Sequence, residues 1–309
     1  MSNELRPAAV RVPCSTSNLG SGYDTLGLAL TRYLRADLAP GPGTLSVERE
    51  GTLAGLDVPP AGDLLVAALT HGLAEAGFEL GGHLRVRSEI PLERGLGSSA
   101  AALVAGFELA RAVLGRAPDR PEAFRFACDH EGHGDNAAPC AMGGLVGVVR
   151  GPSGPRALAL ELSREVGFAY AAPSRGVSTA AARRALPRSV RHSQAVVGLG
   201  RITALVKGLA EADEELIRIG VEDELHVPYR LGLIEGAPAA IEAGYEAGAW
   251  AVTISGSGSG LLAICATDRS GAVASAMKAA FAEHDADALG FALRPDWHGA
   301  THEGPERSG

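Results

Sequence analysis

The chain has 309 residues, which is enough for one large or two medium domains with a core of the size that an enzyme needs. Its formal net charge of -8 argues against a nucleic-acid partner and against an anionic membrane, because both surfaces select clusters of Lys and Arg. The sequence has no run of about 18 apolar residues, and its first residues lack a secretion-signal pattern. We therefore expect a cytoplasmic protein without a membrane segment, whose partners are small molecules or a second copy of the chain.

The first half of the chain predicts several strands and three helices. Apolar residues alternate, or run between Gly and Pro, in the strand segments, and they recur at helical spacing in the others. Asp63 is a suitable N-cap for the first helix. The predicted strands are 9–12, 26–38, 45–47, 83–90 and 144–149, and the predicted helices are 63–77, 98–115 and 121–130.

The second half begins after a turn-rich segment at 151–155, where we place a domain boundary, so that the expected domains are 1–152 and 153–309. Its strands and helices do not alternate regularly, and this mixed order favours an α+β fold over a doubly wound sheet. The predicted strands are 166–172, 250–255, 261–266 and 289–293, and the predicted helices are 178–186, 190–209, 211–219, 237–247 and 270–283.

A glycine-serine loop at 95–99 is the strongest candidate for a phosphate site. Gly95 and Gly97 permit backbone conformations that direct successive N–H groups into one concavity. The helix predicted from Ser98 adds unpaired N–H donors and a positive dipole end, which favour an anion. An ordinary capped turn would explain these residues alone equally well.

Two known phosphate loops do not fit this segment. A Walker A loop needs Gly-Lys-Ser/Thr at its end, whereas Ala100 and Ala101 follow the serines and the chain contains no Gly-Lys pair. Residues 95–100 do match the dinucleotide pattern G-x-G-x-x-A. However, residues 91–94 separate them from the preceding strand, where that turn should follow at once.

Two further polar segments could complete a site around this loop. They are Asn18-Leu19-Gly20-Ser21-Gly22-Tyr23-Asp24 and Glu131-Gly132-His133-Gly134-Asp135-Asn136, and each could also be a simple turn. If the loop holds ATP, Ser99 and Glu131 supply the oxygen ligands that Mg²⁺ prefers. In that case His133, Asp135 and Asn136 would face the acceptor.

Taken in order, these segments resemble the GHMP kinase superfamily, and within it the homoserine kinases. The matching segments are 12–27, 91–101 and 131–139, and the later glycine turn at 256–260 resembles the family's third motif. The resemblance implies two α+β domains, an N-terminal ATP-binding domain and a C-terminal ferredoxin-like domain, with ATP and acceptor bound between them. It also implies phosphorylation of the side-chain hydroxyl of L-homoserine on the route to threonine, and a possible homodimer.

The resemblance assigns roles to matching positions. Ser99 and Glu131 would hold Mg²⁺, and Glu131 and Asp135 would be catalytic. The acceptor would contact Asn18, Asp24, His133, Asn136, Arg183 and Arg230. The nucleotide would contact Pro91, Leu92, Arg94, Gly95, Leu96, Gly97, Ser98, Ser99 and Ala100.

The charges suit an α-amino acid acceptor. A guanidinium fork binds a carboxylate through two parallel hydrogen bonds, so Arg183 and Arg230 could hold the acceptor carboxylate while Asp24 pairs with its ammonium. Arg184 stands beside Arg183, and the sequence does not choose between them. Tyr23 stands where the family pattern has phenylalanine, so it adds a hydroxyl near the acceptor.

Three functional hypotheses remain from the sequence. The first is the homoserine kinase, in which Asp135 is a candidate base, although a general base is not clearly required in this family. The second is a GHMP kinase for another small alcohol. The third is a nucleotide-binding homologue without catalysis, which the joint presence of Ser99, Glu131 and Asp135 disfavours.

Overall fold

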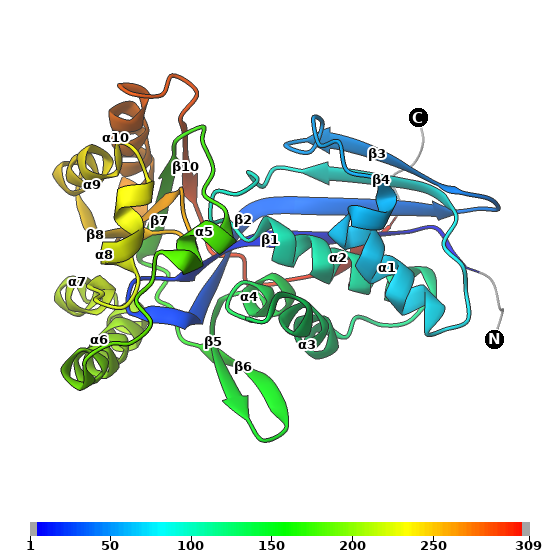
Figure 1. The fold of residues 1–309 in the computed structure, drawn as a ribbon, viewed down its shortest axis with the longest axis horizontal. Helices are drawn as coiled ribbons and strands as arrows, with labels where there is room; N and C mark the ends of the chain where they lie inside the picture. The colour runs from blue at the N-terminus through cyan, green and yellow to red at the C-terminus, as the bar shows by residue number, and fades with distance from the viewer. Residues whose placement is uncertain (1–4, 305–309) are drawn as a thin grey trace.

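The computed structural model describes residues 5–304 and shows two sheets with their helices, side by side along the long axis of the molecule (Figure 1). The first unit contains most of the elements up to residue 160. Its strands are β1 (Ala8–Asn18), β2 (Gly22–Pro40), β3 (Leu45–Gly51), β4 (Gly82–Ser88), β5 (Leu145–Gly151) and β6 (Gly154–Leu160). Its helices are α1 (Leu64–Ala74), α2 (Ser98–Val113), α3 (Arg120–Glu131) and α4 (Ala137–Met142), with a short 3-10 helix at Pro60–Gly62.

The first sheet is organised around the long strand β2. The order β11-β1-β2-β4-β3 includes the last strand, β11 (Thr301–Glu303), which pairs antiparallel with β1. The C-terminal part of β2 pairs with β4, whereas Leu26, Leu28 and the residue between them pair with β5, which continues into β6. Helices α2 and α4 pack on this sheet, and α1 packs on α2.

The second unit is built around a sheet with the order β10-β7-β9-β8, in which every pair is antiparallel. Along the chain, β7, β8, β9 and β10 are interrupted by helices before β8 and again before β10, which is the ferredoxin-like arrangement. The strands are β7 (Val166–Ala172), β8 (Ala249–Ile254), β9 (Leu261–Ala266) and β10 (Leu289–Leu293). The helices are α5 (Thr179–Arg184), α6 (His192–Glu211), α7 (Glu214–Val221), α8 (Val227–Arg230), α9 (Ala237–Glu246) and α10 (Ser270–Ala282), with 3-10 helices at Leu231–Leu233 and Thr267–Arg269.

Alternation along β7 joins the two units. Phe168 and Tyr170 belong to one continuous core with the first sheet, whereas Ala169 and Ala171 pack in a second core with α9 and α10. Successive residues of a strand point to opposite faces, so one strand can serve both cores. The ferredoxin-like sheet is therefore attached to the first sheet by one face and covered by helices on the other.

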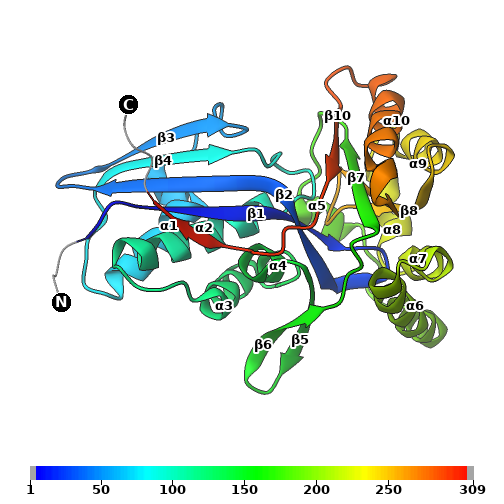
Figure 2. The same cartoon turned by 180° about the vertical axis from the view of Figure 1, so that it is seen from behind.

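Strands β1 and β2 extend beyond the first sheet and reach the helices of the second unit, as both views show (Figures 1 and 2). At their tip, Ser21 Oγ donates a 2.6 Å hydrogen bond to the carbonyl of Gly220. The backbone N–H of Gly256 donates to the carbonyl of Ser17 over 3.2 Å. This extension brings the polar segment that begins at Asn18 against the second unit.

The predicted α+β architecture and its ferredoxin-like second unit are confirmed. All of the predicted strands and helices occur, although β1 runs on to Asn18 and the short elements α4, α8, β6 and β11 were not predicted. The boundary between 152 and 153 stays a prediction. The hairpin of β5 and β6 spans it, and β11 returns to the first sheet. Within residues 5–304, no helix is long and apolar enough to cross a membrane.

Candidate active site

The loop between β4 and α2 has the backbone shape that the sequence predicted. Gly95 and Gly97 have positive φ angles of 71° and 64°, and Gly97 is the N-cap of α2. A Cβ atom on Gly95 would lie 1.8 Å from the carbonyl oxygen of Ser255, and one on Gly97 would lie 2.1 Å from Ser15 Oγ. Only glycine therefore fits at both positions. The loop presents the free N–H groups of a helix N-terminus, which suit a phosphate.

The second unit holds this loop in place. Ser255 Oγ donates to the carbonyl of Gly95 over 2.7 Å, and Tyr170 Oη donates to the carbonyl of Arg94 over 2.6 Å. The guanidinium of Arg94 donates to the carbonyls of Pro173 and Leu92 at 3.0 and 2.8 Å. The side chain of Arg94 therefore stabilises the loop through hydrogen bonds to carbonyl groups. The predicted contact of Arg94 with the nucleotide stays a prediction.

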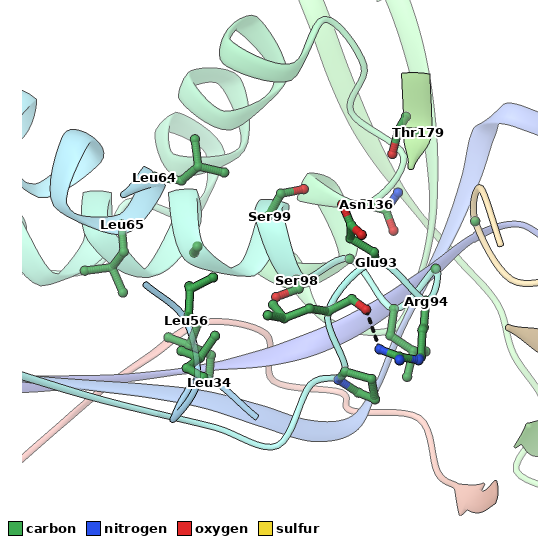
Figure 3. Close-up of a pocket in the computed structure, with 18 of the residues that line it drawn as sticks. Leu34, Leu56, Leu64, Leu65, Glu93, Arg94, Ser98, Ser99, Asn136 and Thr179 are labelled. Atoms are coloured by element: carbon green, nitrogen blue, oxygen red, sulfur yellow. Dashed lines mark hydrogen bonds between the residues drawn. The ribbon is translucent and has the colours of Figure 1, made fainter. Parts of the chain in front are cut away.

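A cavity of about 580 Å³ lies along the loop, with an apolar end and a polar end. Leu34, Leu56, Leu64 and Leu65 surround the apolar end, and Ser98, Ser99, Asn136 and Thr179 lie toward the other (Figure 3). The buried Ala100 is the one residue predicted to contact the nucleotide that is absent from the cavity lining. The predicted nucleotide contacts that do line the cavity are Pro91, Leu92, Arg94, Gly95, Leu96, Gly97, Ser98 and Ser99.

Ser99, in the first turn of α2, meets Glu131, the last residue of α3. Ser99 Oγ donates to Glu131 Oε1 over 2.5 Å. The second carboxylate oxygen, Oε2, is buried and has no hydrogen-bond partner within the described part of the chain. Burial raises the pKa of Glu131, although the bond from Ser99 acts in the opposite direction. An unpartnered carboxylate oxygen beside a hydroxyl is a suitable pair of ligands for a divalent cation.

His133, Asp135 and Asn136 follow α3 directly. His133 Nδ1 lies 2.9 Å from Asp135 Oδ1, and this hydrogen bond raises the pKa of His133. Asp135 itself is buried. Asn136 is held from both sides, because its Nδ2 donates to Ser17 Oγ at 2.9 Å and its Oδ1 accepts from Ser15 Oγ at 3.0 Å. Of these three residues, His133 and Asn136 line the cavity.

The segment after β1, by which we mean the polar residues 18–24 at the turn into β2, brings Asp24 to Arg183. In the sequence, 159 positions separate these two residues. The guanidinium donates to both carboxylate oxygens of Asp24, at 3.0 and 3.2 Å, and to Tyr23 Oη at 3.4 Å. Asn18 shapes this segment, since its Oδ1 accepts from the backbone N–H of Asp24 and its Nδ2 donates to the carbonyl of Gly256. Arg183 rather than Arg184 therefore contacts this predicted acceptor segment, although both arginines are exposed.

Arg230 approaches the same segment from α8 and is almost completely buried. Its guanidinium carbon lies 5.2 Å from the centroid of the Tyr23 ring, and Nε donates to the carbonyl of Ala182 over 3.2 Å. Nη1 faces Nδ1 of His226 at 3.3 Å. The structure thus brings Arg183, Arg230 and Asp24 around Tyr23. These four residues do not line the cavity, but Gly256 does, and its carbonyl accepts from Asn18 and, over 3.5 Å, from Arg230.

Sequence reasoning missed several polar residues that shape the site. Thr16 and Ser255 are buried and hydrogen-bonded to each other at 2.9 Å, which ties β1 to the glycine turn. His226 and Asp223 lie in the polar run before Pro228, where the only signal was an unusual density of charge. His226 contacts Gly20 and Tyr23, about 200 positions away, and no local pattern specifies these contacts.

Comparison with known proteins identifies the family. The family described as GHMP kinases N terminal domain matches residues 63–144, and GHMP kinases C terminal matches residues 205–283. The homoserine kinase of Synechococcus sp. (strain CC9902) is 38% identical over 290 residues, which cover 92% of this chain and 90% of that protein. The chain belongs to the homoserine kinase family of the GHMP kinases. The homoserine kinase of Carboxydothermus hydrogenoformans is 36% identical and covers 94% and 95% of the two chains.

Solved structures agree with this membership. The homoserine kinase from Cytophaga hutchinsonii superimposes with a TM-score of 0.85 at 28% identity, and covers 96% of this chain and 97% of that one. The L. major mevalonate kinase, solved in complex with R-mevalonate, gives a TM-score of 0.72 at 14% identity, over all of both chains. The second likeness concerns the fold alone. The predicted GHMP kinase resemblance is therefore confirmed.

Proposed function

We propose that the chain transfers the γ-phosphoryl group of ATP to the side-chain hydroxyl of L-homoserine and forms O-phospho-L-homoserine. The proposal rests mainly on three groups, two of which line one cavity, while the third adjoins that cavity at Gly256. These are a glycine loop at a helix N-terminus, the Ser99 and Glu131 pair, and a cluster of two arginines and an aspartate. A cytoplasmic location and a homodimer, both expected from the sequence, belong to the same proposal.

The cavity supports ATP as the phosphoryl donor. Its apolar end, with Leu34, Leu56, Leu64 and Leu65, suits the face of a nucleobase, because pockets for such ligands are mostly apolar with a few polar groups. Its polar end lies at the N-terminus of α2, where the N–H groups after Gly97 favour phosphate oxygens. The triphosphate would then extend from the leucines toward Ser99.

The pair Ser99 and Glu131 fits Mg²⁺. The buried Oε2 of Glu131, unpartnered within residues 5–304, needs a positive or hydrogen-bonding neighbour, and Ser99 Oγ supplies a second hard oxygen. Bound there, Mg²⁺ would neutralise charge on the phosphate oxygens during transfer. The raised pKa of Glu131 reflects the cost of burying a lone carboxylate, which a bound cation would remove.

The charged cluster supports an amino-acid acceptor. We assign the acceptor carboxylate to Arg183 and Arg230 and its ammonium to Asp24, because each charge then meets its opposite. In the structure Arg183 and Asp24 pair with each other, and we propose that the acceptor exchanges this contact for its own carboxylate and ammonium. His133 and Asn136 would approach the acceptor from the cavity side.

In phosphoryl transfer, position and charge neutralisation contribute most of the rate. We propose that the loop amides and the N-terminus of α2 stabilise charge on the transferred group. Asp135 is the candidate to accept the proton of the acceptor hydroxyl. It lies 2.9 Å from His133 Nδ1, and this hydrogen bond raises the pKa of His133.

The direct test is product identification. The purified chain is incubated with Mg-ATP and L-homoserine, ADP release is followed by a coupled assay, and the phosphorylated product is identified by ³¹P NMR. A phosphomonoester of homoserine formed together with ADP supports the proposal. A chain that releases no ADP under these conditions, while binding ATP, would instead be the non-catalytic homologue.

A further inference from the structure

His226 is completely buried between the segment after β1 and the guanidinium of Arg230. One ring nitrogen, Nε2, lies 3.0 Å from the carbonyl oxygen of Gly20, and the other, Nδ1, lies 3.3 Å from Arg230 Nη1. A carbonyl only accepts a hydrogen bond and a guanidinium only donates. The ring is therefore neutral, carries its proton on Nε2, and offers the lone pair of Nδ1 to Arg230.

Arg230 is held by uncharged groups alone. Its guanidinium donates to the carbonyl of Ala182 at 3.2 Å, to Nδ1 of His226 and, at 3.5 Å, to the carbonyl of Gly256. Among the residues that the structure describes, no carboxylate lies within salt-bridge distance of it. A buried guanidinium without a paired anion is costly. Its positive charge is left for a ligand, while its direction is set by neutral acceptors.

The ring of His226 is itself fixed on two sides. It stacks on the ring of Tyr23 with centroids 4.9 Å apart and an interplanar angle of 26°. On the other side lies Asp223, whose Oδ2 is 3.8 Å from Nε2 of the ring. The same carboxylate accepts from the backbone N–H of His226 and of Val227, both at 2.7 Å, and so holds the start of α8. Tyr23 directly precedes Asp24, the proposed partner of the acceptor ammonium. The imidazole of His226 therefore contacts both the segment that carries Asp24 and the guanidinium of Arg230.

We propose that His226 is a positioning residue, which sets the direction of the Arg230 guanidinium for the acceptor carboxylate without touching the acceptor. The inference rests on the proposed function, because it assumes that Arg230 binds that carboxylate. A neutral acceptor suits this position for a physical reason. An aspartate or glutamate there would pair with Arg230 and compete with the ligand for its charge.

Two variants test the hydrogen bonds of the two ring nitrogens one at a time. In His226→Gln, the side-chain amide can reach the carbonyl of Gly20 as Nε2 does, but the acceptor at Nδ1 is lost. In His226→Asn, the amide oxygen takes the place of Nδ1 beside Arg230, and the bond to Gly20 is lost. We expect His226→Gln to raise KM for L-homoserine about tenfold, because it removes a hydrogen bond to a charged group. We expect His226→Asn to raise it less than about threefold, with KM for ATP unchanged in both.

A double variant tests whether the effect of His226→Gln on KM for L-homoserine depends on Arg230. If it does, His226→Gln changes KM for L-homoserine by less than about twofold when it is added to Arg230→Ala, because residues coupled through one contact are not additive. Calorimetric binding of L-homoserine to the same variants gives a readout without turnover, and thermal melting verifies that each is folded. Equal losses in the glutamine and asparagine variants, or an undiminished effect on Arg230→Ala, would overturn the inference.

The wild-type chain separates this inference from the proposed function. If it neither binds nor phosphorylates L-homoserine, the proposed function fails and the inference fails with it. If it phosphorylates L-homoserine but the glutamine and asparagine variants behave alike, the inference alone is wrong. If His226→Gln does not fold, His226→Asn still decides, because a KM for L-homoserine raised about tenfold there contradicts a role for Nδ1.

Discussion

Ser99 Oγ donates a 2.5 Å hydrogen bond to Glu131 Oε1, which joins the first turn of α2 to the last residue of α3. The contact places a carboxylate at the N-terminus of the helix that begins at the phosphate loop. Because Oε2 of the same carboxylate is buried without a partner in the described chain, the pair is incomplete as a purely structural contact. It is understandable as half of a cation site.

Glu131→Gln should abolish most of the activity while leaving the protein folded. The amide can still accept from Ser99, but it lacks the charge that Mg²⁺ requires, so we expect kcat to fall by about a hundredfold or more. Activity is measured over a range of Mg²⁺ concentrations. Glu122→Gln is the matched control, since Glu122 lies on the same helix with an exposed side chain. Equal activity of the two variants would remove Glu131 from the metal site.

Asp135→Asn should lower turnover, by about ten- to a hundredfold if Asp135 accepts the proton of the acceptor hydroxyl. The substitution keeps the shape of the buried side chain and removes its charge. KM for ATP should not change, because Asp135 does not line the nucleotide cavity. Asp129→Asn, at an exposed position of α3, controls for the loss of one negative charge. A kcat within about twofold of the wild type would exclude Asp135 from the mechanism.

Arg183→Lys should raise KM for L-homoserine about tenfold or more, because an ammonium cannot reproduce the two parallel hydrogen bonds of a guanidinium. Arg184→Lys is the natural control, because it makes the same change at the next position of α5, which is exposed as Arg183 is. We expect that variant to match the wild type within about twofold. The reverse pattern would show that Arg184 holds the carboxylate and that the contact of Arg183 with Asp24 is only structural.

Gly97→Ala should destroy nucleotide binding. The new Cβ would lie 2.1 Å from Ser15 Oγ, so the loop must move away from β1. Gly115→Ala is the control for backbone strain, because Gly115 has a similar φ of 67° and its nearest neighbour lies 3.6 Å away. Both changes should cost about 1–2 kcal/mol of stability from the left-handed backbone. Only Gly97→Ala should weaken ATP binding, measured by calorimetry, and normal binding there would contradict the assigned loop.

The free energy of unfolding should decrease as the pH falls, in part because of His226. Burial is the largest cause and lowers the pKa of His226 below its usual 6.5. The charge of Asp223 and the hydrogen bond to Gly20 act in the opposite direction, and a smaller effect of Arg230 lowers the pKa further. Below about pH 6.5 the unfolded chain therefore binds a proton at this site that the folded chain does not, so the free energy of unfolding decreases as pH falls. Above that pH, the contribution is fully present.

This effect is measured by denaturant unfolding at about pH 7.5 and about pH 5. The wild type should lose more stability between the two values than His226→Gln, which has no titratable group at this position. The same pH dependence in both proteins, or a larger loss in the variant, would contradict a neutral buried His226.

Local sequence patterns were sufficient to predict most of the helices and strands. The helix at α2 was predictable because apolar spacing, a glycine N-cap and serines coincide, and β7 because it is a continuous apolar run between polar segments. The strand β6 was missed because Pro155 and partly exposed residues give it neither alternation nor a buried run. The strand β11, only three residues long, exists through its pairing with β1 at the other end of the sequence.

The site was predictable in its motifs and less so in its connections. Resemblance to a family indicated Asp24 and Arg183, but their mutual contact follows from the placement of α5 against the segment after β1. The contact of Arg183, and not of Arg184, with Asp24 depends on the direction of one helical side chain, which two adjacent arginines do not reveal. For His226 the only signal was the density of charge around it, and a lone histidine in a charged run is usually a surface residue.

The central claim is that the acceptor is L-homoserine, and the most direct measurement compares acceptors under one set of conditions. Coupled ADP release is recorded with Mg-ATP and L-homoserine, L-serine, mevalonate or shikimate over a range of concentrations. We predict the highest kcat/KM for L-homoserine, weaker turnover of L-serine, and no turnover of mevalonate or shikimate, which lack an ammonium group for Asp24. No turnover of L-homoserine, or a preference for an acceptor without an amino group, would contradict it.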